Sequence, residues 1–143
     1  METKFNFKSQ IATSREQSER LLALGLKEET ADMVWVSNGY IDDYILRPRK
    51  ANTFTDIPQI PAWSLHRLWC LLPRYISIVT HYGQCKAILD LTMDSYQNVS
   101  YLEGVDEPCY DKSFFANDAY ESIYKAIEWL IKEGYFNKEY LEE

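Results

Sequence analysis

Two histidine and cysteine pairs share the same spacing, His66 with Cys70 and His81 with Cys85. Imidazole and thiolate groups are common ligands of tetrahedral zinc, so two such pairs could complete one site. A helix places residues four apart side by side, which suits His66 and Cys70, whereas Gly83 marks a turn inside the second pair. Neither pair forms the short C-x-x-C knuckle typical of structural zinc sites. We therefore expect no metal or other cofactor, and zinc held by these four residues is the alternative.

The three cysteines, Cys70, Cys85 and Cys109, form no disulfide framework and predict free thiols in a reducing compartment. A thiol becomes nucleophilic beside a base or a helix N-terminus, but Cys70 lies late in its expected helix. No cysteine is therefore assigned a catalytic role.

Carboxylates at Asp42, Asp43, Asp90 and Asp94 could form an acid and base pair or bind Mg²⁺, because two acidic groups held close push their pKa values apart. Asp90 and Asp94 share one face of an expected strand, but four residues of strand separate them by about 13 Å. We expect solvated surface charges instead. Motifs for phosphate cradles, serine nucleophile elbows, zinc proteases and calcium loops are missing. A small metal-dependent or thiol-dependent enzyme remains the alternative class.

The basic cluster of the chain is RPRK, where Arg47, Arg49 and Lys50 could hold a phosphate or an acidic partner. The formal net charge is −7, and residues 75–143 carry 5 Lys and Arg against 13 Asp and Glu. Such a chain lacks the broad basic surface of a non-specific nucleic-acid binder, which disfavours nucleic acid as the main ligand. A nucleic-acid-contacting accessory protein stays open as an alternative, while the acidic second half suits a basic protein partner.

Trp129 is the most informative aromatic residue. In the helix expected over residues 118–133, it lies about 150° from the centre of the apolar stripe. Either the C-terminal tail or a hairpin covers this ring, or the ring is an exposed anchor for a partner. Aromatic residues make up 15% of the chain, so large apolar side chains are available for such a surface.

The length of 143 residues and a hydrophobic fraction of 46% are typical of one globular domain, which we place at residues 1–143. The sequence has no apolar run of about 20 residues, and its N-terminus has no signal-peptide core. We therefore expect a cytoplasmic protein that does not enter a membrane.

Three helices are expected from capping signals. The first follows Ser14 or Thr13, has Glu16 or Gln17 at the capping-box position and ends at Gly25. The second follows Ser64 and ends at Pro73. The third covers residues 118–133 and ends at Gly134.

Antiparallel strands are expected between the helices. Asn38-Gly39 predicts a hairpin with a two-residue type I′ turn. Its expected pairs are Ser37 with Tyr40, Val36 with Ile41 and Trp35 with Asp42. A prolyl loop follows over residues 47–61. YISIVTHYG and KAILDLTMD predict a second hairpin with Ile76 and Ile78 facing inward, NVSYLEG adds a third strand, and residues 103–118 are expected to be an acidic loop. The expected fold is α+β in the order α-ββ-α-ββ(β)-α.

Three segments resemble a group of small uncharacterised proteins encoded in genomes and mobile elements of gut Bacteroidetes, including prophage-like regions. They are SREQSERLLALGLKEETADMVW, IPAWSLHRLWCLLP and YKAIEWLIKEGYFNKEYLE. The resemblance implies a bacterial cytosol and a phage or mobile-element origin, and it implies no reaction or catalytic residue. Together with the missing catalytic motifs, it predicts a non-enzymatic accessory protein that binds another protein or itself, as a homodimer.

Overall fold

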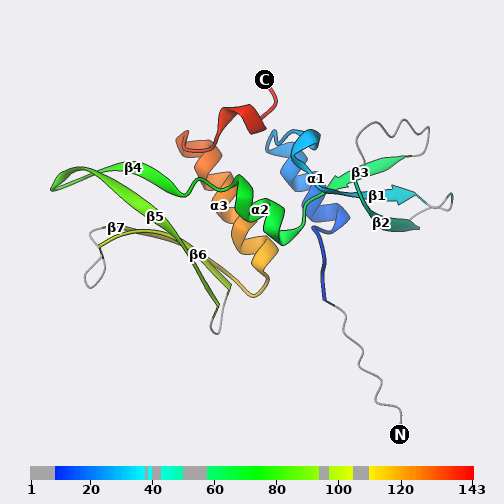
Figure 1. Cartoon of the computed structure of the whole chain (residues 1–143), viewed down its shortest axis with the longest axis horizontal. Coiled ribbons are helices and arrows are strands. Elements are labelled where there is room, and N and C mark those ends of the chain that lie inside the picture. Colours follow the sequence, from blue (N-terminus) through cyan, green and yellow to red (C-terminus); the bar gives the residue numbers. More distant parts are fainter. Residues whose placement is uncertain (1–8, 38, 40–42, 50–57, 94–96, 105–109) are drawn as a thin grey trace, which may run out of the picture.

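A computed structural model describes residues 9–37, 39, 43–49, 58–93, 97–104 and 110–143. Over these residues the chain is α+β, as predicted, with three α-helices between two antiparallel sheets (Figure 1). The elements in chain order are α1 (Arg15–Ala23), the 3₁₀ helix η1 (Glu28–Thr30), β1 (Met33–Ser37), β2 (Tyr44–Pro48), β3 (Gln59–Ala62), α2 (Leu65–Leu71), β4 (Tyr75–Thr80), β5 (Gly83–Met93), β6 (Gln97–Glu103), β7 (Tyr110–Ala116), α3 (Ala119–Glu133) and the 3₁₀ helix η2 (Lys138–Tyr140). The predicted order therefore misses β3 in the first sheet and β7 in the second.

The first sheet has the strand order β2-β1-β3 and contains the predicted hairpin in a different register. The observed partners are Tyr44 for Ser37, Ile45 for Val36 and Leu46 for Trp35. Residues 38–43 connect the two strands, so the predicted two-residue turn is wrong. Gly39 nonetheless has the positive φ that the prediction required, at +87°. Residues 38 and 40–42 lie outside the described part of the chain.

Strand β3 occupies the end of the segment predicted as a prolyl loop. Val34 in β1 pairs with Pro61 in β3, and the N–H of Ser37 donates to the Pro58 carbonyl oxygen at 3.1 Å. Proline has no N–H to donate, but an edge strand needs to pair on one side only, so it tolerates Pro61. The predicted loop over residues 47–61 is therefore wrong at both ends, since β2 extends to Pro48.

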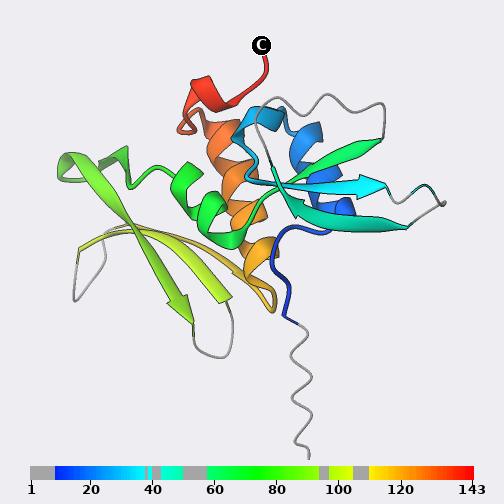
Figure 2. The same ribbon diagram turned by 45° about the vertical axis from the view of Figure 1, so that its right-hand side comes forward.

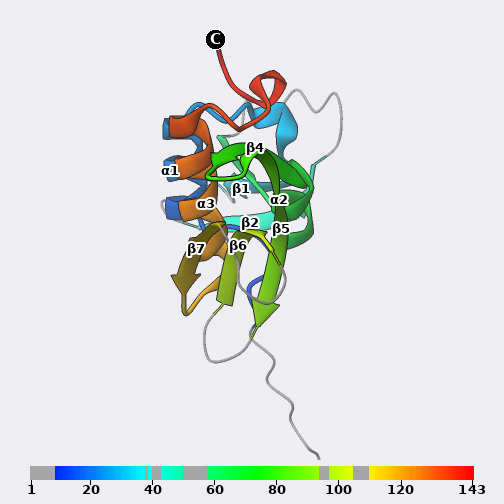
Figure 3. The same cartoon turned by 90° about the vertical axis from the view of Figure 1, so that its left-hand side faces the viewer.

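The second sheet has the strand order β4-β5-β6-β7 (Figure 3). Ile76 and Ile78 face the core, as predicted, and β6 is the predicted third strand. The acidic loop expected over residues 103–118 is wrong, because β7 pairs along the whole of β6. The adjacent Phe114 and Phe115 point to opposite faces of this strand, so Phe114 is buried and Phe115 is 57% exposed.

The helix ends follow the sequence signals. Ser14 Oγ accepts the Gln17 N–H at 3.1 Å, and Gln17 Oε1 accepts the Ser14 N–H at 3.0 Å, which completes the predicted capping box. Ser64 caps α2, and α3 begins after the Asp118 cap and ends at Gly134. Among the described residues, none of the helices combines the length and apolar character needed to cross a bilayer.

The core lies around α3, which packs against the inner face of the four-stranded sheet and against α1 and α2 (Figure 2). Ile123, Ile127 and Leu130 of this helix are fully buried. After α3 the tail returns to the end of α1, where the Lys27 N–H donates to the Tyr140 carbonyl oxygen at 2.8 Å. The N-terminal and C-terminal parts are thus held together by backbone hydrogen bonds as well as by packing.

Candidate interaction surface

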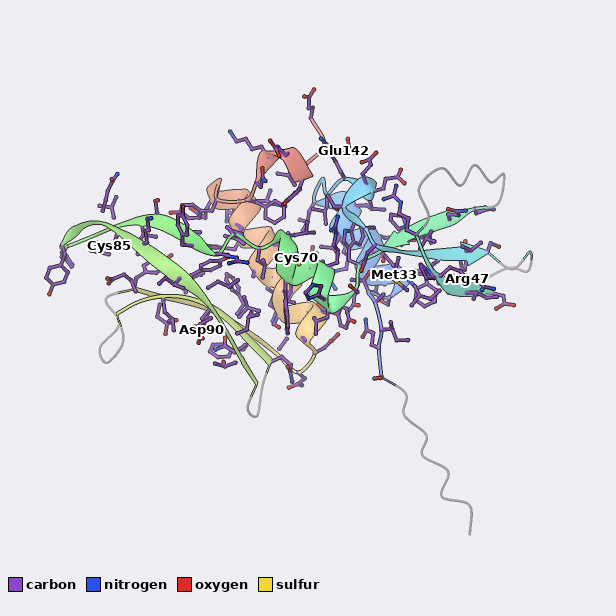
Figure 4. The ribbon with its side chains drawn as sticks, in the orientation of Figure 1. Met33, Arg47, Cys70, Cys85, Asp90 and Glu142 are labelled. Atoms are coloured by element: carbon purple, nitrogen blue, oxygen red, sulfur yellow. The ribbon has the colours of Figure 1, made fainter. Side chains whose placement is uncertain are left out.

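The two histidine and cysteine pairs lie on separate elements. His66 and Cys70 meet on the exposed side of α2, with 3.6 Å between Nε2 and Sγ, as the helical spacing predicts. His81 lies exposed in the turn after β4, and half-buried Cys85 has its Sγ 3.4 Å from Thr80 Oγ1. Figure 4 shows Cys70 in the middle of the molecule and Cys85 out on the β4–β5 hairpin. Within the described residues, no group of three or more His, Cys, Asp and Glu side chains could hold a metal ion.

A shallow depression of about 300 Å³ adjoins the hairpin turn. Its lining consists of Val79, Thr80, His81, Tyr82 and Tyr110. Burial raises the pKa of Tyr110, and the nearby Tyr135 and Glu133 raise it further, so the phenol stays neutral at physiological pH. The depression therefore combines one imidazole with neutral and apolar groups.

The carboxylates considered above do not form a site in the described structure. Asp43 precedes β2 at one end of the molecule, and exposed Asp90 belongs to β5 in the other sheet. The remaining candidates, Asp42, Asp94 and Cys109, lie outside the described residues.

The basic cluster divides between β2 and the residues after it. Arg47 is exposed at the end of the three-stranded sheet, where Figure 4 labels it. The Arg49 guanidinium donates to the Glu28 carbonyl oxygen, and the Arg49 N–H donates to the Asp32 carbonyl oxygen at 3.0 Å. Arg49 thus holds the end of β2 to the segment around η1. Lys50 lies outside the described residues.

Trp129 packs against its own chain. Its ring centroid lies 5.7 Å from that of Phe114 in β7 and 5.5 Å from that of Tyr135 in the tail. The ammonium group of Lys112 lies 5.6 Å from the same ring. A strand and the tail therefore cover much of Trp129, the first of the two arrangements considered from the sequence, and the side chain is half-buried.

Several large, exposed apolar side chains lie on the face of the four-stranded sheet that points away from α3. We call this face the outer face. Strand alternation and register place on it Tyr75, Ser77 and Val79 of β4; Gln84, Lys86, Ile88, Asp90 and Thr92 of β5; Asn98, Ser100 and Leu102 of β6; and Asp111, Ser113 and Phe115 of β7. In the described part of the chain, the helices all lie on the other side of this sheet (Figure 1).

Apolar side chains form a row across three strands of the outer face. Tyr75 pairs with Ile88, which pairs with Leu102, and the first two are 53% and 62% exposed. Lys86 Nζ lies 4.4 Å from the Tyr75 ring centroid, so a cation borders the row. Val79 at 79% exposure and Phe115 at 57% lie on either side of it. Large apolar groups concentrated on one face of a sheet are typical of an interaction surface.

The middle of the outer face between this row and Phe115 is polar. The side chains of Ser100 and Ser113 share a hydrogen bond of 2.9 Å, and Ser113 Oγ donates to Asp111 Oδ1 at 2.5 Å. Ser100 is almost fully buried by its neighbours. The surface therefore has two apolar parts joined by a fixed polar network, an arrangement suited to an extended protein contact.

The sequence contains a signal for this surface that strand assignment alone does not use. In YISIVT the positions opposite Ile76 and Ile78 are Tyr75, Ser77 and Val79, and two of these are large and apolar. A strand with one solvated face normally alternates apolar and polar residues. Tyr75 and Val79 occupy positions where such a strand would carry polar residues, which indicates an exposed apolar face.

No protein-family model, curated protein or solved structure matches this chain.

Proposed function

We propose that this protein is a non-enzymatic accessory protein that acts by binding another protein through the outer face of its four-stranded sheet. The observation that carries the proposal is the apolar row of Tyr75, Ile88 and Leu102, with Val79 and Phe115 beside it. The resemblance to proteins of Bacteroidetes mobile elements supports a bacterial mobile element or prophage as its setting.

A protein partner suits this surface better than a small molecule does. Small ligands bind in concave sites that enclose most of their surface, whereas the row runs across the open face of a sheet. Tyrosine is a typical anchor of protein interfaces, and the buried centre of such an interface is apolar, which suits the aliphatic residues next to Tyr75. Lys86 beside Tyr75 favours a carboxylate near the centre of the partner's contact.

Site-specific photo-crosslinking tests the proposal. A photo-crosslinking amino acid replaces Ile88, and in a matched control it replaces Lys132, which is exposed on α3. In the native host we expect a defined crosslinked product from position 88 and none of the same mass from position 132. The captured protein is then purified and titrated against the wild-type chain and Ile88→Lys, which should weaken binding at least about tenfold.

Two results would count against the outer face as the binding surface. One is the same set of products from positions 88 and 132. The other is equal affinity of the purified partner for the wild-type chain and Ile88→Lys, with circular dichroism showing that the variant is folded.

A further inference from the structure

Strand β4 differs from the other edge strands of the two described sheets in having no protection against pairing. An exposed edge presents unpaired N–H and C=O groups, and proteins blunt such edges with charges, prolines or short strands. β2 carries Arg47 and Pro48, and β3 has four residues with Pro61 among them. β7 carries Asp111 and Lys112, and Lys125 Nζ donates to its Phe115 carbonyl oxygen at 3.0 Å.

β4 has six residues, YISIVT, without a charge or a proline. The Leu89 N–H donates to the Arg74 carbonyl oxygen at 2.9 Å, so Arg74, Ile76 and Ile78 direct their backbone groups toward β5. Alternation then directs the backbone groups of Tyr75, Ser77 and Val79 away from the sheet. In the described structure no strand lies on that side of β4.

We infer that the β4 edge pairs with the β4 edge of a second copy of this chain, in antiparallel orientation about a two-fold axis at Ser77. In this register Ser77 faces its own copy, and Tyr75 of one protomer faces Val79 of the other. About six backbone hydrogen bonds join the two strands. The two four-stranded sheets become one sheet of twice the width. The inference rests on the proposed protein-binding role but uses the edge of the sheet instead of its face.

The side chains that meet in this register complement one another. Val79, the more exposed of the two large outward residues at 79%, covers Tyr75 of the other copy, which is 53% exposed. A tyrosine and a β-branched residue opposite each other form a favourable cross-strand pair. On the inner side Ile76 faces Ile78 of the second copy, so the apolar inner layer continues across the contact.

The distribution of charge favours a second copy in this place. Two chains of net charge −7 repel each other, but no Asp or Glu lies between residues 57 and 89, on either side of β4 in the sequence. The contact therefore brings no carboxylates of that stretch together. The register also places Arg74 opposite Thr80, so no like charges lie directly opposite each other.

The small area of an edge contact predicts a weak dimer. Stable interfaces bury roughly 1,200–2,000 Å² in total, and a pair of six-residue strands lies at or below the lower limit. We expect a monomer and dimer equilibrium that sedimentation equilibrium detects over about 10 μM to 1 mM.

Charge reversal at the two-fold axis tests the inference. Ser77→Lys places two ammonium groups directly opposite each other and should weaken dimerisation about tenfold. Ser77→Glu should do the same, and an equimolar mixture of the two variants should recover a heterodimer. Gln84→Lys is the matched control, because it adds the same charge on an exposed position of β5 next to Val79, one strand inside the edge. It should change the dissociation constant by less than about threefold.

A wild-type chain that stays monomeric at 1 mM would overturn the inference, as would dimerisation of Ser77→Lys at the wild-type strength. Failure of the two charged variants to recover a heterodimer would overturn the symmetric register. Neither variant alters Ile88, so crosslinking from position 88 in the Ser77→Lys background tests the protein-binding proposal separately.

Discussion

Tyr101 shows how one buried polar group is accommodated in this core. Its side chain is fully buried on β6, and its hydroxyl donates to the Pro73 carbonyl oxygen at 2.7 Å. Burial raises the pKa of Tyr101 well above its ordinary value, because the phenolate would lose its hydration. The hydrogen bond fixes the segment between α2 and β4, and the folded chain favours the protonated form of this hydroxyl.

Replacing this hydroxyl should change both stability and its dependence on alkaline pH. Tyr101→Phe leaves the Pro73 carbonyl without its donor and should lower the free energy of unfolding by about 1–2 kcal/mol at pH 7. The folded-state pKa of Tyr101 exceeds its unfolded value of about 10, so its contribution is intact below pH 10 and is lost as the pH rises further. Urea titrations between pH 8 and 11.5 should therefore show a steeper loss for the wild type than for Tyr101→Phe.

The matched control is Tyr82→Phe, since Tyr82 is 83% exposed. It should leave the stability at pH 7 unchanged, because an exposed hydroxyl loses only contacts with water. Equal slopes for the wild type and Tyr101→Phe would contradict the assignment of this titration to Tyr101.

Ile127 and Trp129 lie on different sides of α3, so their substitution compares the stability that each side contributes. Ile127 is fully buried, so Ile127→Ala should lower the free energy of unfolding by about 2–5 kcal/mol. Trp129→Ala removes the ring packed between Phe114 and Tyr135 and should cost about 1–3 kcal/mol, because the ring is only half-buried. Lys132→Ala on the same helix should stay within about 0.5 kcal/mol. Urea unfolding measures all three, and no loss for Trp129→Ala would show that the ring is available to a partner.

The connection between β1 and β2 requires Gly39. Its φ of +87° lies in the left-handed region, and a side chain there would meet open space, so only backbone strain opposes substitution. Gly39→Val should lower the free energy of unfolding by at least about 1 kcal/mol, because β-branched residues resist positive φ. Gly39→Asn should lower it by only a few tenths of a kcal/mol, since asparagine tolerates this conformation. Equal melting temperatures for the two variants would contradict the strain argument.

The elements that the sequence predicts correctly are those with local signals. The capping box of Ser14 and Gln17, the Ser64 cap and the glycine at position 134 each depend on residues a few positions away. The register of β1 and β2 does not follow from Asn38-Gly39, because the pairing of Ser37 with Tyr44 depends on contacts along the whole sheet. β3 and β7 exist because a neighbouring strand accepts them, despite Pro61 in one and charged residues in the other.

For the candidate sites too, the sequence predicts local contacts but not contacts between distant segments. Helical spacing correctly places His66 beside Cys70, but it says nothing of how far α2 lies from the β4–β5 hairpin. The position of Trp129 on its helix leaves open what covers it, and that cover comes partly from Phe114 in a segment expected to be a loop. The outer face follows only once four strands are known to share a sheet.

At the scale of the molecule, one apolar core joins most elements. It includes Leu21 of α1, Trp63 after β3, Leu68 of α2, Tyr101 of β6 and Ile127 of α3. Trp63 is fully buried in this core, and its Nε1–H donates to Thr30 Oγ1 at 2.9 Å. The three-stranded sheet contributes less, because all five residues of its central strand β1 are half-buried.

The attachment of that sheet decides whether the whole chain unfolds as one unit, as the sequence-based domain assignment to residues 1–143 predicts. Trp35 in β1 donates its Nε1–H to the Thr13 carbonyl oxygen at 2.9 Å, and the Thr13 N–H donates to the Trp63 carbonyl oxygen at 2.9 Å. These bonds connect the sheet to the core through the segment before α1. We therefore expect a single transition in urea, with tryptophan fluorescence and far-ultraviolet circular dichroism coinciding.

The variant Trp35→Phe makes this prediction specific to the sheet. It removes one fluorescent reporter and the donor to Thr13, so it should shift the midpoint of unfolding to lower urea while both probes still coincide. Trp69→Phe is the control, because it removes a tryptophan of α2, outside the three-stranded sheet. A fluorescence transition that precedes the loss of circular dichroism in the wild type and disappears in Trp35→Phe would show that the three-stranded sheet unfolds separately. In that case the core around α3 is the cooperative unit, and the three-stranded sheet is attached to it without being part of it.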